Sequence, residues 1–192
     1  MKYYIGDLHF GHKRVLEFDD RPFETVEEMN EAIIKNWNSV VTKNDDVYIL
    51  GDMFWKNDLA EDIMPRLNGN KYLILGNHDR INATIKKHLV WIREIETIRD
   101  GDFHVVLCHY PIAHWKNQRY GYIHLHGHIH KGEDYVFFDQ YKEWCREKGL
   151  PFEAYNVGCM TELINYTPRT LEYILTNRSE ERRVGKECRS RW

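Results

Sequence analysis

Side chains that can bind metal ions recur in this sequence directly after short apolar runs. Leu73-Ile74-Leu75 leads into Gly76-Asn77-His78-Asp79, so that an amide, an imidazole and a carboxylate follow one another. An apolar run of this length fits a buried strand, and open α/β sheets bind their ligands beyond the strand ends. These residue types can hold a cation and move a proton. A polar turn that merely ends a strand would have the same appearance.

Four other segments repeat this order of strand, small turn and ligand. Two of them contain ligand pairs two residues apart, Asp7 with His9 and His128 with His130. That spacing directs both side chains to the same side of an extended backbone. The other two segments each end in a single ligand. The complete set of candidate metal ligands is Asp7, His9, Asp52, Asn77, His109, His128 and His130.

The number and chemistry of these ligands favour two metal ions. Carboxylate, amide and imidazole ligands suit divalent ions such as Mn²⁺, Fe²⁺ and Zn²⁺. Seven ligands are too many for one catalytic ion that keeps an open position, and they are the right number for two ions that share a carboxylate. We therefore predict two divalent cations, with Mn²⁺ as the first choice and Fe²⁺, Zn²⁺ or Ni²⁺ as alternatives.

The elements that must position these ligands begin as alternating strands and helices. Strands are expected at residues 2–5, 47–50 and 73–75, and helices at residues 25–41, 58–67 and 81–89. Thr25 and Glu28 resemble a capping box at the start of the first long helix, and Asp79 is suited to cap the third. This order favours a parallel sheet with crossover connections.

The second half of the chain has a different pattern. Strands are expected at residues 94–98, 103–108, 122–125 and 154–157, the first two forming a hairpin. Residues 133–148 predict an amphipathic helix, ended by Gly149, and a final helix is expected from Thr167-Pro168. The long helix is expected to cover a sheet with one face that carries Phe137, Tyr141, Trp144 and Cys145.

The composition and length of the chain indicate a globular protein with one domain. The chain has 192 residues, of which 42% are hydrophobic, and a single domain is expected over residues 1–177. No apolar run is long enough to span a membrane, and the first residues contain no signal-peptide core. The four cysteines form no C-x-x-C pair. We therefore expect a cytoplasmic protein without a membrane partner.

Residues 178–192 are set apart by a basic, pattern-free composition. They resemble the translation of a sequencing-library adapter, so we expect a non-native tail; a natural nucleic-acid-binding tail is the alternative. This segment holds six of the 27 Lys and Arg residues and three of the 30 Asp and Glu residues, which leaves the remainder with a formal charge of −6. An acidic body gives no electrostatic reason for tight non-specific binding of nucleic acid.

The combined motifs resemble those of the calcineurin-like metallophosphoesterase family, over residues 1 to about 170. The motifs that carry the resemblance are Asp7-x-His9, Gly51-Asp52, Gly76-Asn77-His78-Asp79, His109 and Gly127-His128-x-His130. The resemblance implies an α/β (α+β) fold: a four-layer α/β/β/α sandwich of two mixed β-sheets flanked by helices. It implies one ion held by Asp7, His9, Asp52 and His130, and a second held by Asp52, Asn77, His109 and His128. Many members have a second aspartate where this chain has Trp55.

The implied activity is hydrolysis of phosphodiesters, with phosphomonoesters as a second class. Two ions can share a water and lower its pKa, so a metal-bridged hydroxide is the expected nucleophile. We predict that His78 donates a proton or hydrogen bond to the leaving oxygen, with its orientation and tautomer fixed by Asp79. His12 and Asn77 are predicted to contact the substrate.

Two other functions share the same motifs. A protein-binding scaffold, as in the related retromer subunit, would have lost catalytic residues, whereas every ligand and His78 are present here. A nuclease would use the same chemistry on a larger partner, and the acidic body speaks against it. The favoured partner is a small phosphate ester. For Arg21, both contact with a phosphate and simple solvation fit the sequence. For His114, His124 and His126, both a structural role and a role in the site fit it.

Overall fold

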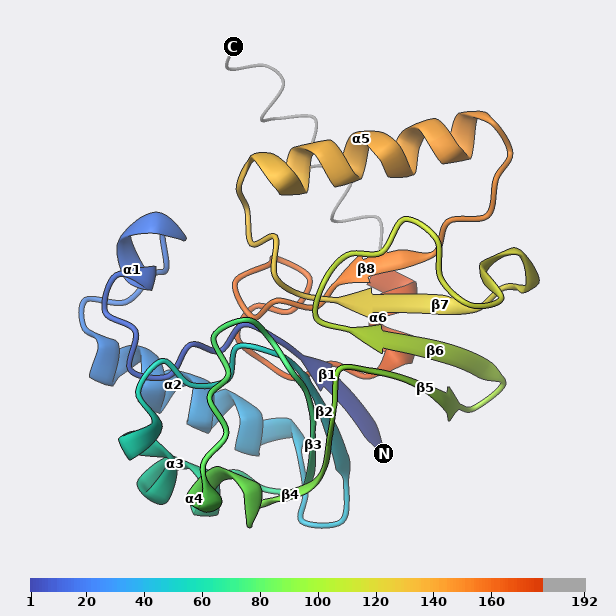
Figure 1. The fold of residues 1–192 in the computed structure, drawn as a ribbon. Coiled ribbons are helices and arrows are strands. Elements are labelled where there is room, and N and C mark those ends of the chain that lie inside the picture. The colour runs from blue at the N-terminus through green and yellow to red at the C-terminus, as the bar shows by residue number, and fades with distance from the viewer. Residues whose placement is uncertain (178–192) are drawn as a thin grey trace.

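Two four-stranded sheets and the helices that flank them form the fold of residues 1–177, which the computed structural model describes. The expected non-native tail lies outside the described residues. Helices lie beside the first sheet at one end of the molecule and α5 lies beside the second sheet at the other (Figure 1). This arrangement is the four-layer sandwich that the sequence motifs imply.

The first sheet is wholly parallel, in the order β1-β2-β3-β4. Its strands are β1 (Lys2–Ile5), β2 (Asp46–Leu50), β3 (Asn70–Ile74) and β4 (Leu89–Arg93). The connections contain α1 (Val15–Phe18), α2 (Val26–Val40), η1 (Asn57–Leu59), α3 (Ala60–Arg66) and α4 (Ala83–Lys86). Helical crossovers return the chain to the same edge each time, which makes the strands parallel. The predicted parallel sheet is confirmed, and β4 is an additional strand that the sequence reading did not include.

The N-terminus of α2 has the predicted cap in a slightly different form. The hydroxyl of Thr25 accepts a hydrogen bond from the Glu28 amide at 3.1 Å. The Glu28 carboxylate returns to the amide of Glu24 at 2.8 Å, one residue before the expected position. The apolar side of the helix, with Met29 and Trp37, is buried as expected.

The helix expected at residues 81–89 is shorter than predicted. It runs from Ala83 to Lys86, and Leu89 already belongs to β4. Its cap is Asn82, whose side chain accepts a hydrogen bond from the Ile85 amide at 2.8 Å. The prediction that Asp79 caps this helix is therefore wrong.

The second sheet is mixed, in the order β5-β6-β7-β8. Its strands are β5 (Ile95–Asp100), β6 (Phe103–Cys108), β7 (Ile123–His126) and β8 (Ala154–Asn156). The predicted hairpin forms the antiparallel pair β5–β6, and the remaining pairs are parallel. Only this second sheet is mixed, because the first contains no hairpin. The other elements are η2 (Gln118–Tyr120), α5 (Glu133–Glu147) and α6 (Leu171–Asn177).

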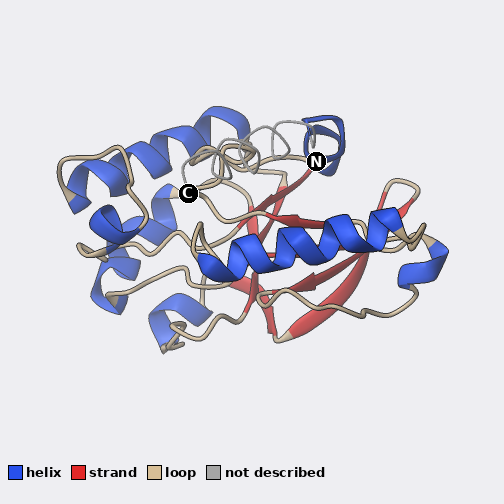
Figure 2. Ribbon diagram, turned by 90° about the horizontal axis from the view of Figure 1, so that it is seen from above, coloured by secondary structure: helices blue, strands red, loops and turns tan. Residues whose placement is uncertain are grey.

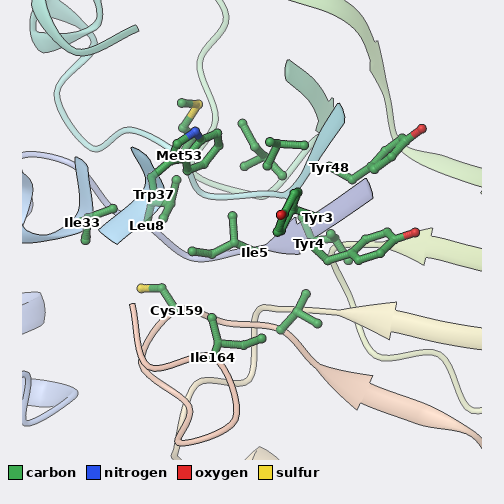
Figure 3. Close-up of a cluster of buried hydrophobic side chains, with 14 of the residues drawn as sticks. Tyr3, Tyr4, Ile5, Leu8, Ile33, Trp37, Tyr48, Met53, Cys159 and Ile164 are labelled. Carbon is green, nitrogen blue, oxygen red and sulfur yellow. The ribbon is translucent and has the colours of Figure 1, made fainter. Parts of the chain in front are cut away.

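Alternation along β6 shows how the second sheet is covered on both faces. Val105 and Leu107 belong to the core that both sheets share, and Figure 3 shows Ile5, Trp37 and Ile164 among the side chains of that core. Val106 points to the opposite face and belongs to a smaller cluster with Trp115 and the α5 residue Cys145. A period of two is what a strand buried on both faces requires.

Helix α5 lies over the strands of the second sheet (Figure 2), but the face it buries differs from the predicted one. Phe138, Tyr141 and Cys145 pack toward the sheet, following the helical spacing of three and four residues. Phe137 and Trp144 lie one residue off this stripe and are 71% and 47% exposed. The prediction that these two share the buried face is therefore wrong.

In residues 1–177 no helix combines the length and the apolar character that crossing a bilayer requires.

Candidate metal centre

The fold brings all seven predicted metal ligands together. They follow strands β1, β2, β3, β6 and β7, whose carboxyl ends meet at one edge of the two sheets. Backbone hydrogen bonds join the segments that carry them: the Asp7 amide donates to Gly51 at 3.0 Å and the Gly127 amide donates to His109 at 2.9 Å. The ligands thus converge because parallel neighbours end side by side.

One group of donor atoms forms a tight triangle. Asn77 Oδ1 lies 3.1 Å from His109 Nε2 and 3.0 Å from His128 Nδ1, and the two ring nitrogens are 3.2 Å apart. Nitrogen and oxygen ligands lie about 2.1 Å from a divalent transition-metal ion, so two ligand atoms on the same ion are separated by about 3.0–3.4 Å. The spacing of these three atoms fits a common cation.

A second group lies beside the first. His9 Nε2 and His130 Nε2 are 3.3 Å apart, and Asp7 Oδ1 is 3.9 Å from His130 Nε2. Asp52 Oδ2 lies between the groups, 3.7 Å from His9 Nε2 and 3.6 Å from His109 Nε2. This position of Asp52 fits a carboxylate shared between two ions.

The electrostatics of the buried ligands also fit a cation. Asp7 and Asp52 are 0% and 1% exposed. Burial raises the pKa of Asp7, with the Asp52 charge as a further cause, and burial lowers the pKa of His9. Buried carboxylates need a compensating positive charge, while a neutral imidazole keeps a lone pair for a metal. The donor set therefore fits a metal ion better than it fits any partner among the described residues.

The backbone at these ligands is in a conformation that L-residues seldom adopt. Nine non-glycine residues of the described chain have a positive φ, and five of them are predicted ligands: Asp7, His9, Asp52, His128 and His130. The left-handed region is sparsely populated because Cβ approaches the backbone. Strain of this kind persists where the surrounding structure imposes it, and it clusters at functional sites.

Two glycines make room for the ligands. A Cβ on Gly51 would lie 2.7 Å from the Cγ of His109, and a Cβ on Gly76 would lie 2.6 Å from the backbone nitrogen of Asp52. Neither approach is sterically allowed. Close packing therefore requires glycine at the position that precedes each of these ligands in the sequence motif.

Comparison with known proteins agrees with this geometry. The model of the calcineurin-like phosphoesterase family matches residues 3–158. The chain belongs to this family. An uncharacterised protein of Methanocaldococcus jannaschii is 31% identical over 178 residues, covering 90% of this chain and 88% of its own. Gene 66 protein of Mycobacterium phage L5 is 30% identical over 167 residues, covering 67% and 76%.

The fold is also seen in a solved structure. A crystal structure of a protein of unknown function from Aquifex aeolicus has a TM-score of 0.69 with 23% sequence identity, and the match covers 92% of this chain and 98% of that one. As a calcineurin-like phosphoesterase, the chain belongs to a family of metal-dependent hydrolases of phosphate esters, and its candidate metal site contains Asp7, His9, Asp52 and His109.

The predicted catalytic and substrate-binding residues of this phosphoesterase lie around the mouth of the site. His78 and Asn77 are exposed and line a cavity of about 400 Å³ together with Trp55, Asn57 and Arg80. The amide of His78 donates to Asp52 Oδ1 at 2.9 Å, which fixes its backbone against the ligand.

His12 is 7% exposed and packs under Trp55, with ring centroids 3.8 Å apart and planes 6° from parallel. Burial, followed by the nearby His78, lowers the pKa of His12 to about 4. This imidazole is therefore neutral at physiological pH. Its contact with substrate stays a prediction.

Asp79 has other hydrogen-bond partners than the predicted His78 ring. Its carboxylate accepts hydrogen bonds from the amides of Gly76, Asp52 and Met53 at 2.8–2.9 Å. Among the described residues its hydrogen bonds run to these amides and not to the His78 ring. Asp79 instead joins the loop after β2 to the loop after β3. The carboxylate thus satisfies three backbone donors at the ends of the two strands.

Asp19 is a site residue that the sequence reading missed. Its carboxylate lies 2.8 Å from Nδ1 of the candidate ligand His130 and 2.9 Å from Arg21 Nη2. Arg21 is 4% exposed and also donates to the Asp7 carbonyl at 2.9 Å, so it is neither solvated nor a phosphate contact. Burial opposes the charge on His130, but the Asp19 hydrogen bond and the charges of Asp7 and Asp19 together outweigh it and raise the pKa of His130. No local pattern in the sequence marks Asp19, because its partner His130 is 111 residues away.

The Asp19→Asn substitution is expected to lower metal affinity about 10- to 100-fold, the usual effect of losing a carboxylate that orients a ligating histidine. Asparagine keeps the shape and an acceptor oxygen but removes the charge that polarises His130. Competition with a metal-binding dye measures the affinity. The control is Asp20→Asn, a change at the exposed neighbour. Equal affinities in the two variants would contradict the role given to Asp19.

His124 is a buried structural residue of β7. Its Nδ1 lies 3.1 Å from the Val106 carbonyl, and its Nε2 accepts a hydrogen bond from the Ile112 amide at 3.2 Å. Burial lowers the pKa of His124 to about 4. His126 is buried as well, with Nδ1 3.0 Å from the Gly127 carbonyl. Both rings are thus engaged by backbone rather than directed at the metal ligands.

Because His124 is neutral when folded, protonation of the unfolded chain is expected to weaken the fold in acid. Between the ordinary pKa of 6.5 and the folded value of about 4, the unfolded state binds more protons, so the free energy of unfolding falls as pH falls. We expect His124→Asn to remove about 3 kcal/mol of this dependence. Urea unfolding of metal-free proteins between pH 7 and pH 4 measures it, with the exposed His104→Asn as control. Parallel curves for His124→Asn and wild type would contradict the expectation.

Proposed function

We propose that this protein hydrolyses phosphodiesters, and phosphomonoesters as a second class, with two divalent metal ions. The observation that carries the proposal is the position of Asp52 Oδ2, 3.7 Å from His9 Nε2 and 3.6 Å from His109 Nε2. One ion would be held by Asp7, His9, Asp52 and His130, and the other by Asp52, Asn77, His109 and His128. When bound, such ions supply an activated water and neutralise the charge on the phosphoryl oxygens.

The protein's own groups would orient the ester and handle the leaving group. His78 stands at the edge of the ligand cluster, 5.7 Å between ring centroids from His9, and faces the cavity of about 400 Å³. From there its imidazole would donate a proton to the leaving oxygen as the ester bond breaks. The His78 amide donates to Asp52, and the Asp79 carboxylate joins the two loops. These two contacts would hold the His78 backbone in a fixed position relative to the ligands.

The alternatives are weaker on the same observations. A scaffold has no need for a complete ligand set with a strained backbone at five positions. A nuclease would use the same centre, but the formal charge of −6 outside residues 178–192 disfavours long nucleic acids. Cytoplasmic location is part of the proposal and is supported by Cys108, Cys145 and Cys159, which are free thiols.

The test is hydrolysis by purified protein prepared without metal and then given Mn²⁺, Fe²⁺, Zn²⁺ or Ni²⁺ in turn. We expect turnover of bis(p-nitrophenyl) phosphate, slower turnover of p-nitrophenyl phosphate, and loss of both in EDTA. Binding of metal without turnover of either ester would favour the scaffold. Cleavage of DNA or RNA with no cleavage of the small esters would favour the nuclease.

A further inference from the structure

Trp55 is an exposed aromatic residue at the mouth of the metal centre. Trp55 is 47% exposed, although an indole is a large apolar group that gains free energy from burial. One face packs on His12 at 3.8 Å, and the ring centroid of His78 is 5.0 Å away. Because His12 itself is buried, its ring holds the packed face of the indole in place. The result is a fixed, flat apolar surface beside the predicted proton donor.

The indole lines two cavities that also contain charged residues in their walls. On the His78 side, the cavity of about 400 Å³ is lined in part by Asn57 and Arg80. On the His12 side, a cavity of about 450 Å³ is lined in part by the basic residues Lys13, Arg14 and Lys56 and by the acidic residues Glu24 and Glu27. Of the charged residues that line the two cavities, four are basic and two are acidic, so the lining carries a small positive excess on a chain that is acidic overall. Such a setting attracts an anion that also has a flat ring.

The chemistry of the cavity beside His78 distinguishes between kinds of flat ring. Asn57 Nδ2 donates to the carbonyl of Arg80, which fixes the amide at the cavity wall with its oxygen as an acceptor. An amide acceptor and a guanidinium match the polar edge of a nucleobase, whereas a phenyl ring has no group to pair with them. Stacking on an aromatic side chain is tolerant of base identity because every base has a π-face.

We propose that Trp55 is a specificity-determining residue that stacks the base of a nucleoside leaving group; this rests on the phosphodiesterase function proposed above. The substrate is a small nucleotide phosphodiester whose leaving nucleoside enters the cavity beside His78. Water adds to phosphorus and releases one proton to solvent, the bond from phosphorus to the nucleoside oxygen breaks, and that oxygen takes its proton from His78, which regains a proton from solvent. The products are a phosphomonoester and a free nucleoside.

The test compares two substrates that differ only in the leaving base. One is the dinucleoside phosphodiester ApA, and the other is the same diester with hydrogen in place of the base on the leaving nucleoside. We expect wild-type kcat/KM to favour the base about 10- to 100-fold, the size of one base stack. The Trp55→Leu substitution should bring this ratio close to one, and Trp55→Phe should keep most of it. The control is Trp144→Leu on α5, which removes a tryptophan of the same 47% exposure and should keep the wild-type ratio.

Binding gives a second readout that does not depend on turnover. Adenosine monophosphate added to the metal-free protein should quench tryptophan fluorescence in the wild type and in Trp144→Leu, and not in Trp55→Phe. Quenching that survives Trp55→Phe would overturn the proposal, because the stacked tryptophan would then be a different one.

The outcomes separate this inference from the proposed function. Hydrolysis of both diesters at equal kcat/KM by the wild type would overturn the role of Trp55 and leave the phosphodiesterase function standing. Faster hydrolysis of benzyl methyl phosphate, whose leaving group is also an alkoxide, than of ApA would also overturn it, in favour of a phenyl-bearing substrate. Absence of hydrolysis with every metal would overturn the function, while quenching lost only in Trp55→Phe would still support the base-stacking surface.

Discussion

Replacing Asp52 with asparagine is expected to release the metal ions and to lower phosphodiesterase activity by about three orders of magnitude or more. Loss of a single electrostatic element of a catalytic site costs about 10²–10³-fold, and Asp52 would serve both ions. Its Oδ2 lies within 3.7 Å of ring nitrogens from both ligand groups. An amide oxygen retains the shape of the side chain but not the negative charge that balances two cations.

Elemental analysis of the variant after dialysis, together with the rate on bis(p-nitrophenyl) phosphate, measures this effect. Asp58→Asn is the matched control, since Asp58 is exposed and six residues along the chain. The metal-free variant should be at least as stable to urea as metal-free wild type, because the Asp52 charge contributes to the raised pKa of the neighbouring Asp7. A variant that kept a full complement of metal would exclude Asp52 as the shared ligand.

Replacing His78 with alanine is expected to leave the metal content unchanged and to lower kcat about 10²- to 10⁴-fold, the range for loss of a general acid. The ring lines the cavity and is outside the ligand triangle of Asn77, His109 and His128. Its backbone amide donates a hydrogen bond to Asp52, and alanine retains that amide. The substitution should therefore separate proton transfer from metal binding.

The leaving group provides the sharpest measurement for His78. A p-nitrophenolate departs without a proton, whereas an alkoxide needs one, so His78→Ala should slow an alkyl ester far more than a p-nitrophenyl ester. His104→Ala, at an exposed histidine stacked on Tyr122, is the control. Equal losses on both esters would assign His78 to binding of the phosphoryl group instead of to proton donation.

Much of the candidate site follows from local sequence. Each ligand comes after an apolar run and a small turn, and the chain order of strands and helices predicts a parallel sheet, which forms. Parallel strands end at the same edge, so ligands that follow them converge without further information. Glycine before a ligand, as at Gly51 and Gly76, is a local steric requirement and is equally visible in the sequence.

Other features needed contacts between distant parts of the chain. Asp19 meets His130 across 111 residues, and the burial of Arg21 follows from that contact and from the Asp7 carbonyl. The sequence suggests that Asp79 caps a helix and orients His78, yet the amides that donate to it belong to the loop after β2 and to Gly76. Local propensity could not choose among these partners.

The sequence by itself determined which side chains can bind metal and at which strand ends they stand, because a strand, its period of two and its terminal turn are properties of neighbouring residues. The tertiary structure alone decided which ligands share a neighbourhood, which charges are buried beside them, and that Trp55 lies flat on His12 beside His78. Those outcomes depend on distances between residues far apart in the chain, and such distances are fixed only when the two sheets pack.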